Sequence, residues 1–234
     1  MKIISIRRGF ASDHSSTSYE FYAIDKPLTN DARRKVSSLS SRANPTKRGV
    51  RFVYNVDGYD IPGSWESLMC NYYDVMARNE YDWWTLAMAF DASEEQQAEI
   101  SRYKFEGVED MGVSVSTFDK RVIVTINCQL DSSSLYDIGD AYQDEYGDEE
   151  EEEEGEEAAE DTQELDVDTG SPLLDLLAEV RDQLIHGDYR ALYAVWEEYG
   201  CEDEGEEEPK PPVPSDKPTG THIVEQFRNL LTEP

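Results

Sequence analysis

The chain has 234 residues, of which 21 are Lys or Arg and 52 are Asp or Glu, so its formal net charge at pH 7 is −31. The hydrophobic fraction of 38% is low for this length, and we expect part of the chain to lie outside any packed core. The sequence holds no apolar run of about 18 residues and starts with too short an apolar stretch for a signal peptide, which indicates a cytoplasmic protein without a membrane partner.

The first part of the chain alternates between short strands and helices. Strands are predicted where β-branched and aromatic residues gather, at Lys2–Arg8, Tyr19–Ile24, Val50–Val56 and Trp83–Phe90. Helices are predicted at Leu28–Leu39, Ser64–Met76 and Ser93–Arg102. Ser93 has the residue type and position of an N-cap for the third helix.

Apolar and polar residues alternate over 113–117 and again over 122–126, on either side of a turn at Asp119-Lys120. This pattern predicts an antiparallel hairpin with one buried face. With strands predicted at both ends of residues 1–134, the order of elements favours an α+β body. We expect a mainly antiparallel sheet with flanking helices rather than a doubly wound fold.

Two segments are predicted to be linkers. Residues 135–170 include six consecutive glutamates, Glu149–Glu154, and almost no apolar residues over 144–168, so we expect disorder. Residues 201–220 combine an acidic stretch with five prolines, which favour an extended backbone. A short C-terminal helix is expected within 221–234.

Residues 171–200, between the linkers, read as a helical hairpin. Ser171 and Pro172 begin its first helix, Gly187 ends it, Asp188 caps the second helix and Gly200 ends that one. Apolar residues at helical spacing form the predicted seam, which is also the predicted partner-binding set: Leu177, Val180, Leu184, Leu192, Val195 and Trp196. Two helices of this size cannot bury such a seam by themselves, so it must dock on the body, a second copy or a partner protein.

Charge divides the chain unevenly. Residues 1–134 hold 16 basic and 19 acidic side chains, whereas residues 135–234 hold 5 and 33. Basic side chains in the first third are candidates for phosphate binding: Arg33, Arg34, Lys35, Arg42, Lys47 and Arg48. The net charge of −31 repels a polyanion, so a nucleic-acid partner is possible but not favoured.

One cluster suggests an enzyme, although we expect none. Arg7, Ser16, Ser18 and Glu20 combine the residue types found on neighbouring strands of ADP-ribosyltransferases, which they resemble. In that family the elements are much farther apart in sequence, so this remains a reserve hypothesis. A base role for His14 towards a nearby serine has no identifiable orienting partner, and the hydroxyls equally suit hydrogen bonds to loop backbone.

Metal and cofactor signatures are weak. Asp166, Asp168 and Gly170 partly match a calcium loop, but the glycine comes one place early and the distal glutamate is missing. The three cysteines are far apart, without a CxxC pair: Cys70, Cys128 and Cys201. We expect reduced thiols, no metal and no cofactor.

Two segments resemble known bacterial sequences. Residues 8–19 are similar to the Gly-Phe and serine-rich opening of uncharacterised bacterial and phage proteins, a resemblance that implies no function. Gly187–Tyr193, Trp196 and Pro211–Pro214 resemble the C-terminal region of bacterial SWIM-type zinc-finger proteins. The zinc ligands of a SWIM finger are absent here, so the resemblance implies a shared interaction module rather than zinc or nucleic-acid binding.

These observations favour a non-enzymatic interaction or adaptor protein that docks on a protein partner through the helical hairpin. The alternative is a nucleic-acid-related protein. In that case the acidic tail would regulate the basic N-terminal patch, or would imitate DNA towards a basic partner. Neither the identity of the partner nor the oligomeric state follows from the sequence.

Overall fold

A seven-stranded sheet forms the centre of the protein, with strand order β2-β1-β3-β4-β7-β6-β5 and every neighbouring pair antiparallel. The computed structural model describes residues 17–41, 43–54, 61–80, 83–135, 138, 169–200 and 210–232. The strands are β1 Thr17–Tyr22, β2 Gly49–Tyr54, β3 Val75–Glu80, β4 Trp83–Asp91, β5 Phe105–Glu106, β6 Gly112–Phe118 and β7 Arg121–Gln129. The expected α+β class with a mainly antiparallel sheet is confirmed.

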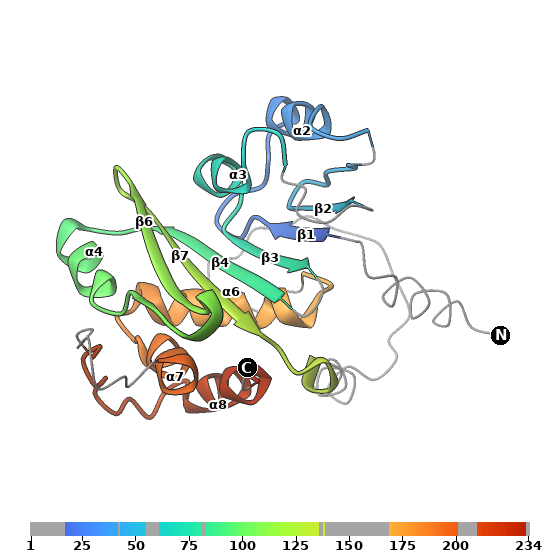
Figure 1. Cartoon of the computed structure of the whole chain (residues 1–234). Coiled ribbons are helices and arrows are strands. Elements are labelled where there is room, and N and C mark those ends of the chain that lie inside the picture. The colour runs from blue at the N-terminus through green and yellow to red at the C-terminus, as the bar shows by residue number, and fades with distance from the viewer. Residues whose placement is uncertain are drawn as a thin grey trace, which may run out of the picture.

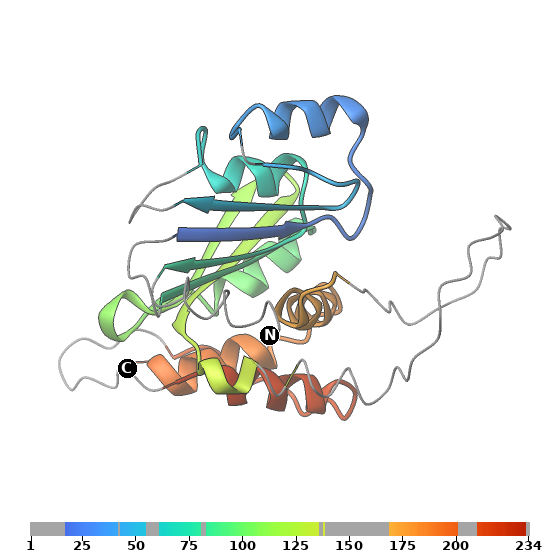
Figure 2. The same ribbon diagram turned by 90° about the vertical axis from the view of Figure 1, so that its right-hand side faces the viewer.

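Helices cover both faces of this sheet. They are α2 Asn30–Ser37, α3 Trp65–Asn71, α4 Glu94–Ser101, α6 Pro172–Ile185, α7 Arg190–Tyr199 and α8 Thr221–Leu230, with a 3-10 turn, η1, at Val108–Asp110. Figures 1 and 2 show α2 and α3 on one side of the sheet and α6, α7 and α8 on the other. The sheet is therefore the middle of three layers.

The sequence of β4 explains why both layers are needed. Leu86, Met88 and Phe90 point into the core beneath α6 and α7, while Ala87 and Ala89 belong to the core beneath α2 and α3. Because successive side chains of a strand point to opposite faces, a strand that is apolar at every position must be covered on both.

Most predicted elements are found where the sequence placed them. The Ser93 side chain accepts a hydrogen bond from the backbone N–H of Gln96, as expected of an N-cap. The predicted helix Ser64–Met76 is wrong in its second half, because α3 ends at Asn71 and β3 begins at Val75. The predicted strand Lys2–Arg8 lies outside the described residues.

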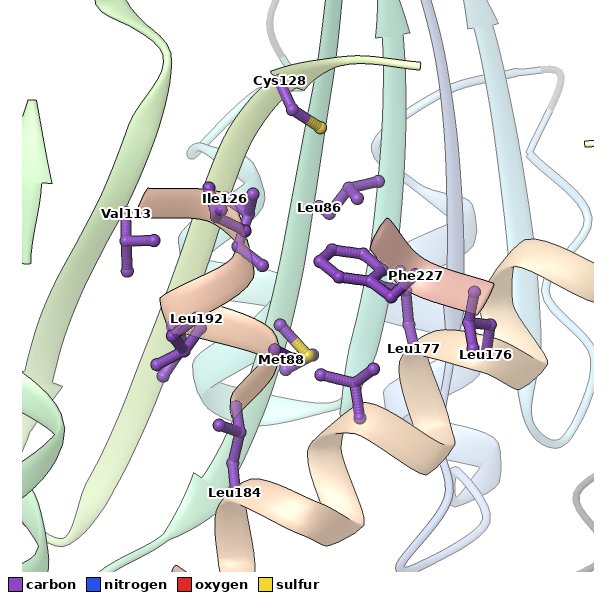
Figure 3. Packing of buried hydrophobic residues seen from close by; sticks show 14 of the residues in the cluster. Leu86, Met88, Val113, Ile126, Cys128, Leu176, Leu177, Leu184, Leu192 and Phe227 are labelled. Atoms are coloured by element: carbon purple, nitrogen blue, oxygen red, sulfur yellow. The ribbon is translucent and has the colours of Figure 1, made fainter. Parts of the chain in front are cut away.

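The helical hairpin packs on the body, which was one of the three docking alternatives. One continuous core contains strand residues such as Met88 and Ile126 together with Leu177 of α6 and Leu192 of α7. Figure 3 shows side chains of α6, α7 and α8 lying against those of β4, β6 and β7. Residues 171–200 are thus a layer of the body.

A buried ionic network fastens α6 to one end of the sheet. Asp74 is 4% exposed and accepts hydrogen bonds from two backbone N–H groups after β1 and from Arg121 at 2.7 Å. Arg181 of α6 donates to the Ala89 carbonyl at 2.8 Å and to Asp25 at 2.6 Å, and its Nη2 lies 3.8 Å from Asp74. The network joins four strand ends to one helix.

The described ends of the two predicted linkers also contact the body. Leu135 packs against the core and Ile138 is buried within it, so the body extends beyond residue 134. Arg190 donates to the carbonyls of Lys217 and Thr219, while the Lys217 ammonium donates to the Gly187 carbonyl at 3.1 Å. These contacts hold residues 217–219 against the hairpin turn. The predicted disorder of 144–168 lies outside the described residues.

Candidate functional site

The predicted partner-binding seam is not an exposed surface. Five of its six side chains are fully buried in the protein's own core: Leu177, Val180, Leu184, Leu192 and Val195. Trp196 is half-buried, with its ring centroid 5.4 Å from that of Tyr193 and 5.5 Å from the Lys210 ammonium. The prediction that this seam contacts a partner is corrected for those five residues, because the sheet already occupies it.

The described candidates for phosphate binding line neither of the two pockets given below. Arg33 donates to the Pro45 carbonyl at 3.0 Å, and Arg48 donates to the Ala23 and Ile24 carbonyls, so both arginines hold backbone. Arg34 pairs with Asp31 on the same helix. Lys35 and Lys47 are exposed, whereas Arg42 lies outside the described residues.

The reserve enzyme hypothesis gains no support from the residues that are described. Arg7, His14 and Ser16 lie outside them. Glu20 accepts a hydrogen bond from Ser171 at 3.2 Å and pairs with Arg51. These contacts join β1 to the start of α6 and to β2.

The described cysteines and acidic residues form neither a reactive thiol nor a metal-binding cluster. Burial raises the pKa of the Cys70 and Cys128 thiols, and Cys128 is fully enclosed, so both are protonated at neutral pH and poor nucleophiles. Within the described ranges, no three His, Cys, Asp or Glu side chains are grouped so as to hold a metal ion. Cys201 and the predicted calcium-loop residues Asp166 and Asp168 lie outside the described residues; Gly170 is described and adjoins α6.

The surface with clear binding geometry is the outer edge of β2. This strand pairs with β1 on one side, and no described strand pairs with its other side. Val50 and Phe52 point into the core under α2 and α3, whereas Arg51 and Val53 are exposed. An unpaired strand edge of this length presents a row of backbone N–H and C=O groups to any extended segment beside it.

A pocket of about 570 Å³ adjoins this edge on the side opposite α2 and α3. Its walls come from the last three residues of β1, the first half of β2, the turn residues Asn44 and Thr46, and residues between Thr169 and Leu174 at the start of α6. The lining therefore offers hydroxyls, an amide, the Glu20 carboxylate and the Arg51 guanidinium beside the backbone edge. The pocket exists because the hairpin docks on the body.

Local hydrogen bonds shape two walls of this pocket. The Thr46 hydroxyl accepts from the Gly49 backbone N–H at 2.8 Å, and the Thr46 N–H donates to the Gly49 carbonyl at 2.8 Å, which closes the turn into β2. At the start of α6, the Thr169 N–H donates to Asp175 at 2.8 Å. The Ser171 hydroxyl donates to Glu20 and so ties this turn to β1.

Arg51 is the charged group at the rim of the pocket. Its side chain is 54% exposed, and its Nε lies 3.2 Å from Glu20 Oε1. No hydrogen bond from its two terminal nitrogens to another described residue is found. These nitrogens are available to a second carboxylate, because a guanidinium carries five donors in a fixed plane.

A second pocket, of about 580 Å³, lies at the opposite edge of the sheet. Lys104, Glu106 and Asp110 contribute opposite charges to its lining, with Ser114 and Asn127 between them. The strand edge beside it is partly covered: β5 has two residues and pairs with Gly112 and Val113, which leaves the outer side of residues 114–118 of β6 without a described strand. We regard the β2 edge as the stronger site.

The sequence reasoning included Arg51 among the basic residues but missed its role. The alternation in Val50–Tyr54, with Arg51 and Val53 between buried neighbours, indicates a strand with one open face. Which strand forms the end of the sheet depends on pairing over long distances and is not visible in the local pattern.

Comparisons with protein-family models, curated proteins and solved structures find no match to this chain. The resemblance to the SWIM-type C-terminal region therefore stays a prediction. Among the described helices, none is both long and apolar enough to cross a membrane.

Proposed function

We propose that this protein is a non-enzymatic interaction protein that binds an extended segment of a partner protein along the outer edge of β2. The observation that carries the proposal is the open edge itself: the outer side of the six residues Gly49–Tyr54, beside which no described strand lies. Strand addition to such an edge is a common mode of peptide recognition, in which backbone hydrogen bonds give affinity and side-chain pockets give specificity.

Two further features support this mode. Val53 is 39% exposed on the edge strand, and β2 contains no proline, which would interrupt pairing, and one charged residue, Arg51. The adjoining pocket lies where every second side chain of an added strand would point. We propose the cytoplasm as the compartment, which suits the free thiols of Cys70 and Cys128.

A photo-cross-linking amino acid at position 53 tests the proposal in the full-length protein. Phe118, at the far end of β6 and 46% exposed, is the matched control position. A partner should cross-link at 53 and not at 118. The purified partner should then slow hydrogen–deuterium exchange of backbone amides in residues 49–54. Equal cross-linking at both positions, or unchanged exchange across β2 with the partner bound, would contradict the proposal.

A further inference from the structure

We infer that the segment bound at β2 is acidic, with a carboxylate on Arg51 and an apolar side chain beside Val53. This inference rests on the proposed function, because it specifies which extended segment the edge accepts. It follows from the spacing of the exposed side chains, from the unused donors of Arg51 and from the charge of the surrounding chain.

Spacing sets the pattern of the bound segment. Arg51 and Val53 are two residues apart and lie on the same face of β2, the face opposite the α2 and α3 core. A strand added beside β2 would be about 4.8 Å away, with its same-face side chains also two residues apart. Its side chains opposite these two positions therefore follow the order acidic, any residue, apolar, in the direction set by the pairing.

Arg51 favours a negative charge on the bound segment. Its contact with Glu20 runs through Nε, which leaves both terminal nitrogens to face a residue on an added strand. A carboxylate there would accept charge-assisted hydrogen bonds, whereas a lysine would place two cations in contact. Asn44, Thr46 and Ser171 supply further polar groups within the pocket.

The surrounding charge favours the same choice. Among the described residues near this edge, Lys47 is exposed in the turn that leads into β2. Most of the negative charge belongs to residues 135–234. Repulsion from distant exposed carboxylates falls off over about 8 Å at physiological ionic strength, so contacts beside β2 outweigh it.

Two synthetic peptides of seven residues test the inference on the full-length protein. The first, Thr-Glu-Thr-Val-Thr-Glu-Thr, places glutamates and valine on one face of a strand; the second replaces both glutamates with lysine. The acidic peptide should bind at least about tenfold more tightly by titration calorimetry at low salt and should slow amide exchange in residues 49–54.

Variants locate the effect. Arg51→Gln should weaken the acidic peptide by roughly fivefold to tenfold, and Arg51→Glu should reverse the preference between the peptides. Arg102→Gln is the matched control, because Arg102 is 57% exposed and its ion pair with Glu99 lies elsewhere. This control should leave both affinities unchanged.

The outcomes separate this inference from the proposed function. If both peptides bind equally and protect β2, the edge binds extended segments but the acidic preference is wrong. If neither peptide protects β2 at millimolar concentration, the acidic-segment inference is wrong, and the cross-linking result still decides the proposed function. A dimer in sedimentation that Val53→Lys dissolves would assign the edge to a second copy and would overturn both.

Discussion

Leu184→Ala tests whether α6 belongs to the same cooperative unit as the sheet. The Leu184 side chain is 0% exposed and lies in the core that also contains Met88 of β4 and Val124 of β7. Truncating a fully buried leucine to alanine costs about 2 to 5 kcal/mol, since transfer and cavity terms add. Each kcal/mol lowers the midpoint of a domain this size by about 2 to 4 °C, so we expect a loss of roughly 5 to 15 °C.

Tryptophan fluorescence makes the assay specific. The protein has four tryptophans, of which Trp65, Trp83 and Trp84 lie on α3 and β4 and Trp196 lies on α7. A Trp196→Phe background therefore reports unfolding of α3 and the sheet, without a signal from α7. In urea, Leu184→Ala should move the midpoint in this background by as much as it does with all tryptophans present.

Ile185→Ala is the graded control. Ile185 is the next residue of α6 but is only partly buried against the same core, so its truncation should cost distinctly less. A body transition that does not respond to Leu184→Ala would mean that the hairpin unfolds as a separate unit. The reasoning that joins the two parts into one core would then be wrong.

Four other substitutions probe different positions by thermal and urea unfolding. Gly107→Ala should cost about 3 kcal/mol, since the new Cβ would lie 2.1 Å from the Tyr199 carbonyl oxygen, whereas Gly63→Ala, with open space but a φ of +87°, should cost about 1 to 2 kcal/mol. Tyr73→Phe should raise stability at pH 7, because the buried Tyr73 hydroxyl has no hydrogen-bond partner among the described residues. Burial also raises the pKa of Tyr73 in the folded state, so this tyrosine ionises first in the unfolded state and lowers the stability of the fold as the pH rises above about 10. The phenylalanine variant should lose less stability there. Arg181→Met should cost about 2 to 4 kcal/mol, because it leaves the Ala89 carbonyl without its donor and removes a charge beside Asp74. An unchanged midpoint in Gly107→Ala, a drop in Tyr73→Phe at pH 7 or a neutral Arg181→Met would each contradict the contact concerned.

Local signals sufficed for the elements that carry their own pattern. The Ser93 cap, the turn at 119–120 and the helices ended by Gly187 and Gly200 are set by residues within a few positions of each other. The strand β3 has no such signal, since Val75–Ala77 continues the apolar pattern of the preceding helix. Its conformation is set by pairing with β1 on one side and β4 on the other.

The sequence left undecided which surface covers the hairpin, although one pattern indicated the sheet. An amphipathic pair of helices shows that its apolar face must be covered, but it does not show which surface covers it. Residues 86–90 are apolar at every position, which requires cover on both faces of the strand. The helices α2 and α3 cover one face, and without α6 and α7 the described part of the chain would leave Met88 and Phe90 exposed.

The candidate site was hidden for a related reason. Eleven basic residues precede residue 52, and the alternation around Arg51 indicates an open strand face without indicating that the strand forms an edge of the sheet. Arg33 and Arg48 donate to backbone carbonyls and so stabilise the fold. Arg51 keeps its terminal nitrogens at an edge where β1 is the one described neighbouring strand. Because the docked start of α6 completes the adjoining pocket, the burial that removes the hairpin seam from partner binding also builds the site proposed in its place.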